Sequence, residues 1–190
     1  MDKKPVICVF CGSSPGAEPA YARDARRFGE LLAERGFDLL FGGGYVGLMG
    51  EVVHAARQGG AHVTGVLPTF LRHLEPPSLD AQRILVAPDL FERKKLMLSL
   101  SDGFAVLPGG LGTLDELFEV VTAVQLKVFD KPIALLDTHG FYAPLEALIE
   151  RVVEKGFASP AARTYYCRVA TPIEVVDFLS ERLLLRAPGA

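Results

Sequence analysis

Residues 103–116 read GFAVLPGGLGTLDE and carry the clearest indication of the fold. The run 103–107 is apolar, as in a buried strand, and a helical pattern begins near Thr113. The proline and three glycines between them let the backbone bend and approach a ligand closely. Free N–H groups at a helix start favour an anion. The stretch predicts a strand, a phosphate-binding turn and a helix, and its simpler alternative is an ordinary strand–turn–helix connection.

The same alternation of strand and helix extends in both directions from this turn. Apolar, strand-like runs are predicted at 6–11, 37–41, 62–67, 82–86, 103–107 and 132–136. Helical spacing of apolar residues is predicted over 21–35, 46–58, 90–100, 113–127, 142–155 and 173–184. Apolar strands alternating with amphipathic helices indicate an α/β fold, a parallel sheet covered on both faces. No linker or repeat divides residues 1–190, so we expect a single domain.

Glycine-rich loops follow three of the predicted strands. They span 12–16, 42–47 and 109–112. In open parallel sheets, ligands bind beyond the carboxyl ends of the strands. We therefore expect one crevice to collect all three loops, with Gly12, Ser13 and Gly109 among its binding residues.

Composition excludes several classes of partner. The formal net charge is -3 and no long run of Lys or Arg occurs, so we expect no nucleic acid to bind. No apolar stretch is long enough to cross a membrane, and the first residues do not resemble a signal peptide. We expect a cytoplasmic protein without a membrane partner.

Two motifs suggest cofactors that the surrounding residues do not support. Residues 42–47, GGGYVG, match the dinucleotide pattern G-x-G-x-x-G, but the next strand ends without the acidic residue that a ribose requires, since no carboxylate occurs before Glu75. Cys8 and Cys11 form a Cys-x-x-Cys within a predicted strand, where they would point to opposite faces as buried thiols. The four histidines show no metal-ligand spacing. We expect neither a cofactor nor a metal.

The predicted helix 90–100 carries a second candidate group of functional residues. We expect Leu90, Met97 and Leu100 to form its buried stripe, with Arg93 and Lys94 one turn away. A charged run of this kind is often a solvated face. Beside the glycine-rich turn it has a second interpretation, because arginine suits bidentate contact with phosphate or carboxylate.

Four motifs together resemble the LOG family, the cytokinin riboside 5'-monophosphate phosphoribohydrolases often mislabelled as lysine decarboxylases. They are C-G-S-S at 11–14, G-G-G-x-x-G-L-M-G at 42–50, E-R-K-x-x-M at 92–97 and P-G-G-x-G-T-x-x-E at 108–116. The likeness runs from about Val6 to Phe157. The chain differs from the commoner family pattern at Leu90–Phe91, Asp115, Ala123 and Phe129, positions that bear on the base pocket and the subunit interface.

The resemblance implies a Rossmann-like, doubly wound sheet and hydrolysis of the N-glycosidic bond of an adenosine-type monophosphate, with a free base and ribose 5-phosphate as products. Arg93 and Glu116 match the catalytic pair of the family. Its substrate-binding positions correspond to Glu75, Lys94, Gly110, Leu111, Gly112, Thr113, Leu114, Asp115 and Thr122. The resemblance also implies a homodimer, which the crowding of Val120, Val121, Val124 and Leu126 on more than one helix face supports.

The residues fit this chemistry but leave alternatives open. Cleavage builds positive charge on the ribose, which Glu116 would stabilise, or Glu116 would activate water. Arg93 would orient the ribose, Glu116 or the departing base. Competing functions are an AMP nucleosidase in purine salvage and a non-catalytic nucleotide-binding protein. A pyridoxal-phosphate decarboxylase is disfavoured, because neither Lys94 nor Lys95 lies in a pattern typical of that cofactor.

Overall fold

The strands lie side by side in the order β4-β3-β2-β1-β5-β6-β7, and every neighbouring pair is parallel. The structure is a computed structural model, and it describes residues 4–73 and 78–185. In that part of the chain the strands are β1 (Val6–Phe10), β2 (Asp38–Phe41), β3 (Val63–Pro68), β4 (Arg83–Ala87), β5 (Gly103–Val106), β6 (Ile133–Leu136) and β7 (Cys167–Val169).

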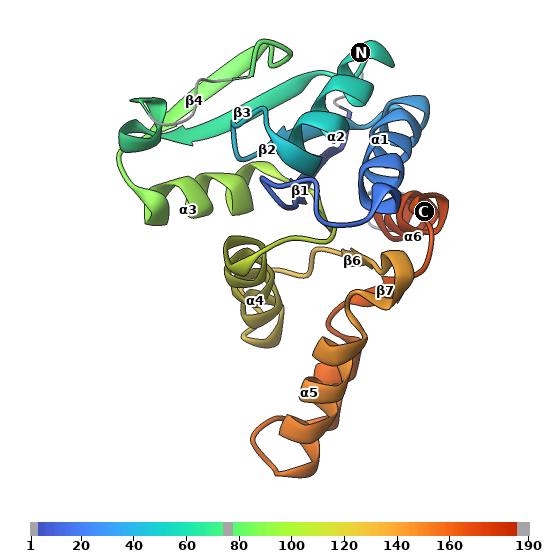
Figure 1. The fold of residues 1–190 in the computed structure, drawn as a ribbon. Coiled ribbons are helices and arrows are strands. Elements are labelled where there is room, and N and C mark those ends of the chain that lie inside the picture. The colour runs from blue at the N-terminus through green and yellow to red at the C-terminus, as the bar shows by residue number, and fades with distance from the viewer. Residues whose placement is uncertain (1–3, 74–77, 186–190) are drawn as a thin grey trace.

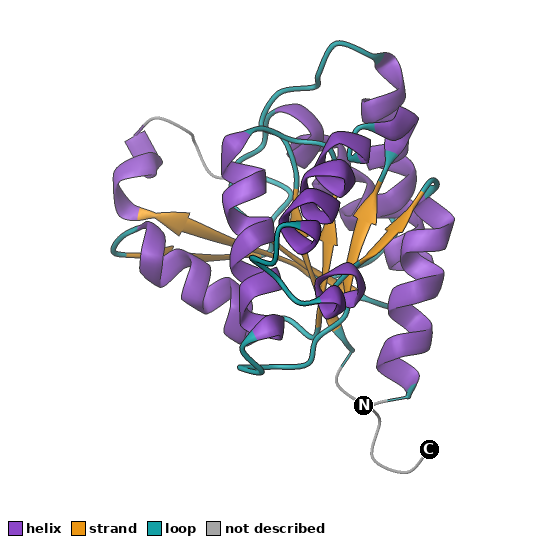
Figure 2. Cartoon of the chain, turned by 90° about the horizontal axis from the view of Figure 1, so that it is seen from below, coloured by secondary structure: helices purple, strands orange, loops and turns teal. Residues whose placement is uncertain are grey.

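Helices cover both faces of the sheet (Figures 1 and 2). One face carries α1 (Pro19–Glu34), α2 (Gly47–Gln58) and α6 (Pro172–Leu184). The other carries α3 (Leu90–Leu100), α4 (Leu111–Gln125) and α5 (Ala143–Glu154). Short 3-10 helices occur at η1 (Thr69–His73), η2 (Thr138–Gly140) and η3 (Pro160–Thr164). None of the helices in the described ranges is long and apolar enough to cross a bilayer.

Alternating side chains of the central strands fill two cores. Along β1, Ile7 and Val9 pack with the α1, α2 and α6 side, whereas Cys8 and Phe10 pack with the α3 and α4 side. Cys8 and Cys11 are both buried, form no disulfide and lie on opposite faces of the sheet. This alternation follows from the two-residue period of a strand. The expected α/β fold with a doubly wound parallel sheet is confirmed.

Two expectations from the sequence differ from the structure. Strand β7 was not predicted, because it has three residues, lies at the sheet edge and is only partly buried. In α3, Met97 is buried, but Leu90 and Leu100 are 44% and 41% exposed, so the predicted buried stripe is wrong. Within α3 only Met97 is fully buried, and apolar residues at both ends of the helix remain in contact with solvent.

The strand order reverses between β1 and β5. The chain winds outward from β1 to β4 and then returns to place β5 on the other side of β1. The loops that leave these two strands consequently diverge to opposite faces, and a crevice opens between them.

Candidate functional site

The three glycine-rich loops meet at this reversal, as expected. The Gly12 N–H donates to the Pro108 carbonyl at 3.0 Å, and the Gly12 carbonyl accepts from the Leu48 N–H at 3.0 Å. Gly47 has a φ of 63°, and a side chain there would collide with the backbone of Ser13. A cavity of about 200 Å³ lies between the loops, lined by Gly12, Ser13, Ser14, Gly16, Tyr21, Leu48, Pro108, Gly109, Gly110 and Phe141.

The turn before α4 presents an open helix start. Gly110 is the N-cap residue and has no side chain to cap the first N–H groups, and no acidic residue lies in the first turn. Thr113 is buried beneath the turn, where a side chain on Gly109 would collide with its hydroxyl. Helix-start N–H groups and the positive end of the helix dipole attract anions. The turn is therefore shaped to receive a phosphate-sized anion.

Arg93 of α3 and Glu116 of α4 face each other across the gap between their helices. Arg93 Nη2 lies 3.4 Å from Glu116 Oε1, and their side chains are only 14% and 12% exposed. The Arg93 Nε is buried and has no hydrogen-bond partner among the described residues. The guanidinium also lies directly against Gly42, where a methyl group would collide with it. The structure thus brings together α3, α4 and the loop after β2.

Burial dominates the electrostatics of Glu116. It raises the pKa of this carboxyl to about 7, and nearby Asp115 and Glu119 act in the same direction. The positive charges of Arg93 and Lys94 oppose the shift without cancelling it. A carboxyl with a pKa near neutrality exchanges protons readily under physiological conditions.

Lys94 joins the two helices beside this pair. Its Nζ lies 2.7 Å from Glu119 Oε2 and 3.1 Å from Asp115 Oδ2. These contacts, the Glu119 hydrogen bond foremost, raise the pKa of the ammonium, so it stays charged. Lys94 therefore bridges α3 and α4, and its positive charge is offset by the two carboxylates that it contacts.

The remaining predicted residues are more scattered. Ser13, Leu111 and Gly112 are exposed around the turn, and Leu114 is half-buried behind it. Thr122 is exposed on α4, six residues beyond Glu116, which is about 9 Å along a helix axis. Glu75 lies outside the described residues. Within 4–73 and 78–185, no group of three or more His, Cys, Asp and Glu is arranged to hold a metal ion.

Sequence reasoning missed Tyr142, which lies beneath the glycine-rich turn before α4. The notable feature is its buried hydroxyl, which donates to the Leu107 carbonyl. In the sequence it appears only as the first residue of a predicted helix, and no local pattern marks it as part of a site.

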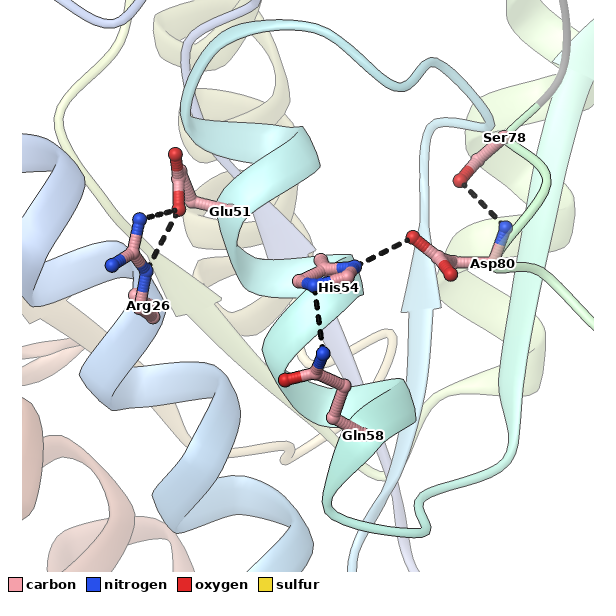
Figure 3. A network of polar contacts seen from close by, with 6 residues as sticks. All are labelled: Arg26, Glu51, His54, Gln58, Ser78 and Asp80. Carbon is pink, nitrogen blue, oxygen red and sulfur yellow. Dashed lines mark hydrogen bonds and ion pairs between the residues drawn. The ribbon is translucent and has the colours of Figure 1, made fainter.

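A larger cavity of about 770 Å³ lies on the α1 and α2 side of the molecule. Figure 3 shows its polar residues: Arg26 binds Glu51 through two nitrogens, and His54 joins α2 to Asp80 at 3.2 Å. Gln58 contacts the second ring nitrogen of His54 at 2.9 Å. Because these charged groups pair with one another, the network ties α1, α2 and the segment before β4 together.

Comparison of the sequence with known proteins assigns this chain to a family. Residues 49–179 match a family model described as "Possible lysine decarboxylase". The chain is 43% identical over 175 residues to the cytokinin riboside 5'-monophosphate phosphoribohydrolase LOG3 of Arabidopsis thaliana, covering 92% of this chain and 81% of that protein. The cytokinin riboside 5'-monophosphate phosphoribohydrolase LOG of Oryza sativa subsp. japonica is 42% identical, over 92% of this chain and 72% of that protein.

Solved structures of similar fold include proteins that are named for binding or carrying the molybdenum cofactor. The molybdenum cofactor carrier protein of Chlamydomonas reinhardtii superposes with a TM-score of 0.72 at 21% identity, over 96% of this chain and 99% of that chain. The molybdenum cofactor binding protein of Rippkaea orientalis superposes with a TM-score of 0.71 at 24% identity, over 95% of this chain and 98% of that chain. At these identities the likeness concerns the fold alone. The family model and the sequence relatives together show that this chain belongs to the LOG family.

Proposed function

We propose that the protein is a phosphoribohydrolase that cleaves the N-glycosidic bond of an N6-substituted adenosine 5'-monophosphate, giving a free base and ribose 5-phosphate. The observation that carries this proposal is the buried pair of Arg93 and Glu116 beside an uncapped helix start. The names of the sequence relatives support the same reaction.

The 5'-phosphate binds at the start of α4 in this proposal. The first-turn N–H groups beyond Gly110 donate to its oxygens. Fixing the phosphate anchors the sugar, and this binding energy is used to orient the reacting carbon. The catalytic pair lies within two turns of the anchor, so the ribose spans the space between them.

Glu116 acts on the sugar as its glycosidic bond breaks. The ribose gains positive charge, which an ionised Glu116 stabilises, or the carboxylate accepts a proton from the attacking water. Arg93 holds one Glu116 oxygen, and its unpaired Nε is a donor for the ribose or the departing base. No metal or cofactor is needed for these steps.

A direct test is chromatography of AMP and N6-isopentenyl AMP after incubation with the protein. We expect adenine-type base to appear from both, and faster from the N6-substituted nucleotide. Preferential cleavage of AMP would identify a nucleosidase of purine salvage instead. Binding of either nucleotide without any base release would identify a non-catalytic nucleotide-binding protein.

A second copy of the chain is the partner that fits the exposed face of α3 and α4. In the monomer, apolar side chains of α3, of α4 and just beyond α4 remain exposed: Leu90, Phe91, Leu111, Phe118 and Leu126. Of the residues expected to crowd toward an interface, Val120, Val121 and Val124 pack in or against the core instead, and Leu126 is exposed. Patches of this kind mark interfaces, and a symmetric pair is the commonest closed assembly. The interface would flank Arg93 and Glu116 and cover exposed Thr122. We therefore propose a homodimer whose contact surface supports the site.

A further inference from the structure

Tyr142 occupies a buried position directly behind the phosphate-binding turn. It is 1% exposed, and its hydroxyl donates to the Leu107 carbonyl at 2.7 Å. Leu107 is the last residue before Pro108, and its own N–H donates to the Phe10 carbonyl. Leu107, the residue that enters the turn, is thus held by β1 through its N–H and by the Tyr142 side chain through its carbonyl.

The turn has few other means of support. Pro108 has no N–H to donate, and its carbonyl accepts from the Gly12 N–H at 3.0 Å. The next residues, Gly109 and Gly110, have no side chains that could fix their backbone. A buried carbonyl that loses its donor is costly, so the Leu107 carbonyl favours whichever backbone position keeps the Tyr142 contact.

Tyr142 is itself fixed from the edge of the sheet formed by β6 and β7. Its N–H donates to Asp137 Oδ1 at 2.6 Å, and Asp137 Oδ2 accepts from Arg168 Nη1 at 2.6 Å. Asp137 follows β6 and Arg168 lies in β7. Hydrogen bonds therefore run continuously from the edge strand to the start of the phosphate-binding turn.

We propose that Tyr142 is a positioning residue whose hydroxyl holds the turn at Leu107–Pro108, so that the N–H groups at the start of α4 stay directed at the substrate phosphate. This inference rests on the proposed function, because it names how the same phosphate site is held. Tyr142 acts through the turn and does not touch the substrate.

The phenol is suited to act as a permanent donor. Burial raises the pKa of Tyr142 well above its usual range, with Cys11 and Asp137 contributing. The hydroxyl therefore keeps its proton at every pH at which the protein is expected to be folded. Phenylalanine would preserve the packing and remove only the hydrogen bond.

The test compares proteins with and without Tyr142→Phe in binding of AMP and of adenosine by titration calorimetry, both carrying Glu116→Gln so that bound AMP is not cleaved during the titration. Loss of one buried hydrogen bond at the turn should weaken AMP binding about tenfold. Adenosine lacks the phosphate, so its affinity should stay unchanged. Tyr166→Phe is the matched control: it removes a hydroxyl bonded to Glu146, away from the turn, and should change neither affinity.

Unchanged AMP affinity in Tyr142→Phe, or equal weakening of AMP and adenosine, would overturn the inference. If Tyr142→Phe does not fold, Asp137→Asn provides the second variant, because it weakens the Arg168 contact while its amide oxygen still accepts the Tyr142 N–H. That variant should again weaken the binding of AMP and leave the binding of adenosine unchanged. Equal weakening of the binding of both ligands would count against the role of Tyr142.

Binding separates this inference from the proposed function. A wild type that binds AMP and releases no base refutes the hydrolase while Tyr142 is still tested by affinity. A wild type that binds AMP no more tightly than adenosine refutes the phosphate site and the role of Tyr142 together.

Discussion

Arg93 Nη2 approaches Glu116 Oε1 to 3.4 Å, yet the Arg93 Nε on the same guanidinium has no hydrogen-bond partner among the described residues. A closed, bidentate arginine–carboxylate pair would use two parallel hydrogen bonds at shorter distances. The contact between α3 and α4 therefore holds the carboxylate without saturating either group. Arg93 and Glu116 therefore keep hydrogen-bonding groups that a bound substrate would use.

Replacing Glu116 with glutamine should abolish base release and leave AMP binding largely intact. The amide keeps the size of the carboxyl but can neither carry negative charge nor accept a proton, so turnover should fall by at least about a hundredfold. The measurement is the rate of base release by chromatography, together with AMP affinity. Glu150→Gln, at an exposed ion pair on α5, is the control. Near-normal turnover in Glu116→Gln would refute its assignment.

Replacing Gly42 with alanine should inactivate the protein through Arg93. Gly42 has no positive φ, so the backbone accepts alanine, but the new methyl group would displace the guanidinium. Misplacement by about 1 Å can cost on the order of a hundredfold in rate. Arg93→Ala should also lose most turnover. In a double-mutant cycle, adding Gly42→Ala to Arg93→Ala should lower turnover little further. Additive losses would show that Gly42 acts elsewhere.

The pH dependence of turnover should report the ionisation of Glu116. Its pKa of about 7 means that the carboxylate form increases as pH rises through neutrality. Because the proposed reaction uses the carboxylate, kcat/KM should rise through about pH 7 and then level off. A fall over the same range would identify Glu116 as a proton donor instead.

Unfolding experiments provide an independent check of the same ionisation. The folded-state pKa lies above the ordinary 4.5, so between pH 4.5 and 7 the native protein holds a proton that the unfolded chain has lost. The carboxyl therefore favours the folded state at low pH, and this contribution is lost as pH rises. Relative to Glu116→Gln, the wild type should lose up to about 3 kcal/mol between pH 4.5 and 8. A constant difference would contradict the raised pKa.

The 5'-phosphate should be required for efficient cleavage. Several charge-assisted hydrogen bonds at the α4 start, each worth about 1.5–3 kcal/mol, are unavailable to a riboside. The riboside should therefore show a kcat/KM lower by orders of magnitude than its monophosphate. Equal values for the two substrates would mean that the turn binds something else.

Sedimentation at micromolar concentration should show a homodimer. Phe91 is 79% exposed on α3, and an aspartate there should shift the protein toward the monomer and reduce turnover, since charge is costly in an apolar interface. Leu184→Asp, at an exposed site on α6 over the opposite face of the sheet, should leave the dimer intact. A fully active wild-type monomer would refute both the interface and its support of the site.

The sequence alone determined the α/β alternation, the six longer strands and the location of the glycine-rich turn between β5 and α4. These features are encoded locally, because apolar runs, helical spacing and glycines at a helix start act on neighbouring residues. The order of the strands then places the carboxyl-end loops at one edge, so the meeting of three glycine-rich loops also followed from pattern and topology.

Only the tertiary structure decided how the site is held and tuned. The contact of Gly42 with Arg93, the bond from Tyr142 to Leu107 and the burial that raises the pKa of Glu116 join residues far apart in the chain. The exposure of Leu90 and Phe91 likewise depends on how far α3 presses into the sheet. Packing and desolvation depend on distances through space, and the spacing of residues along a single chain does not specify them.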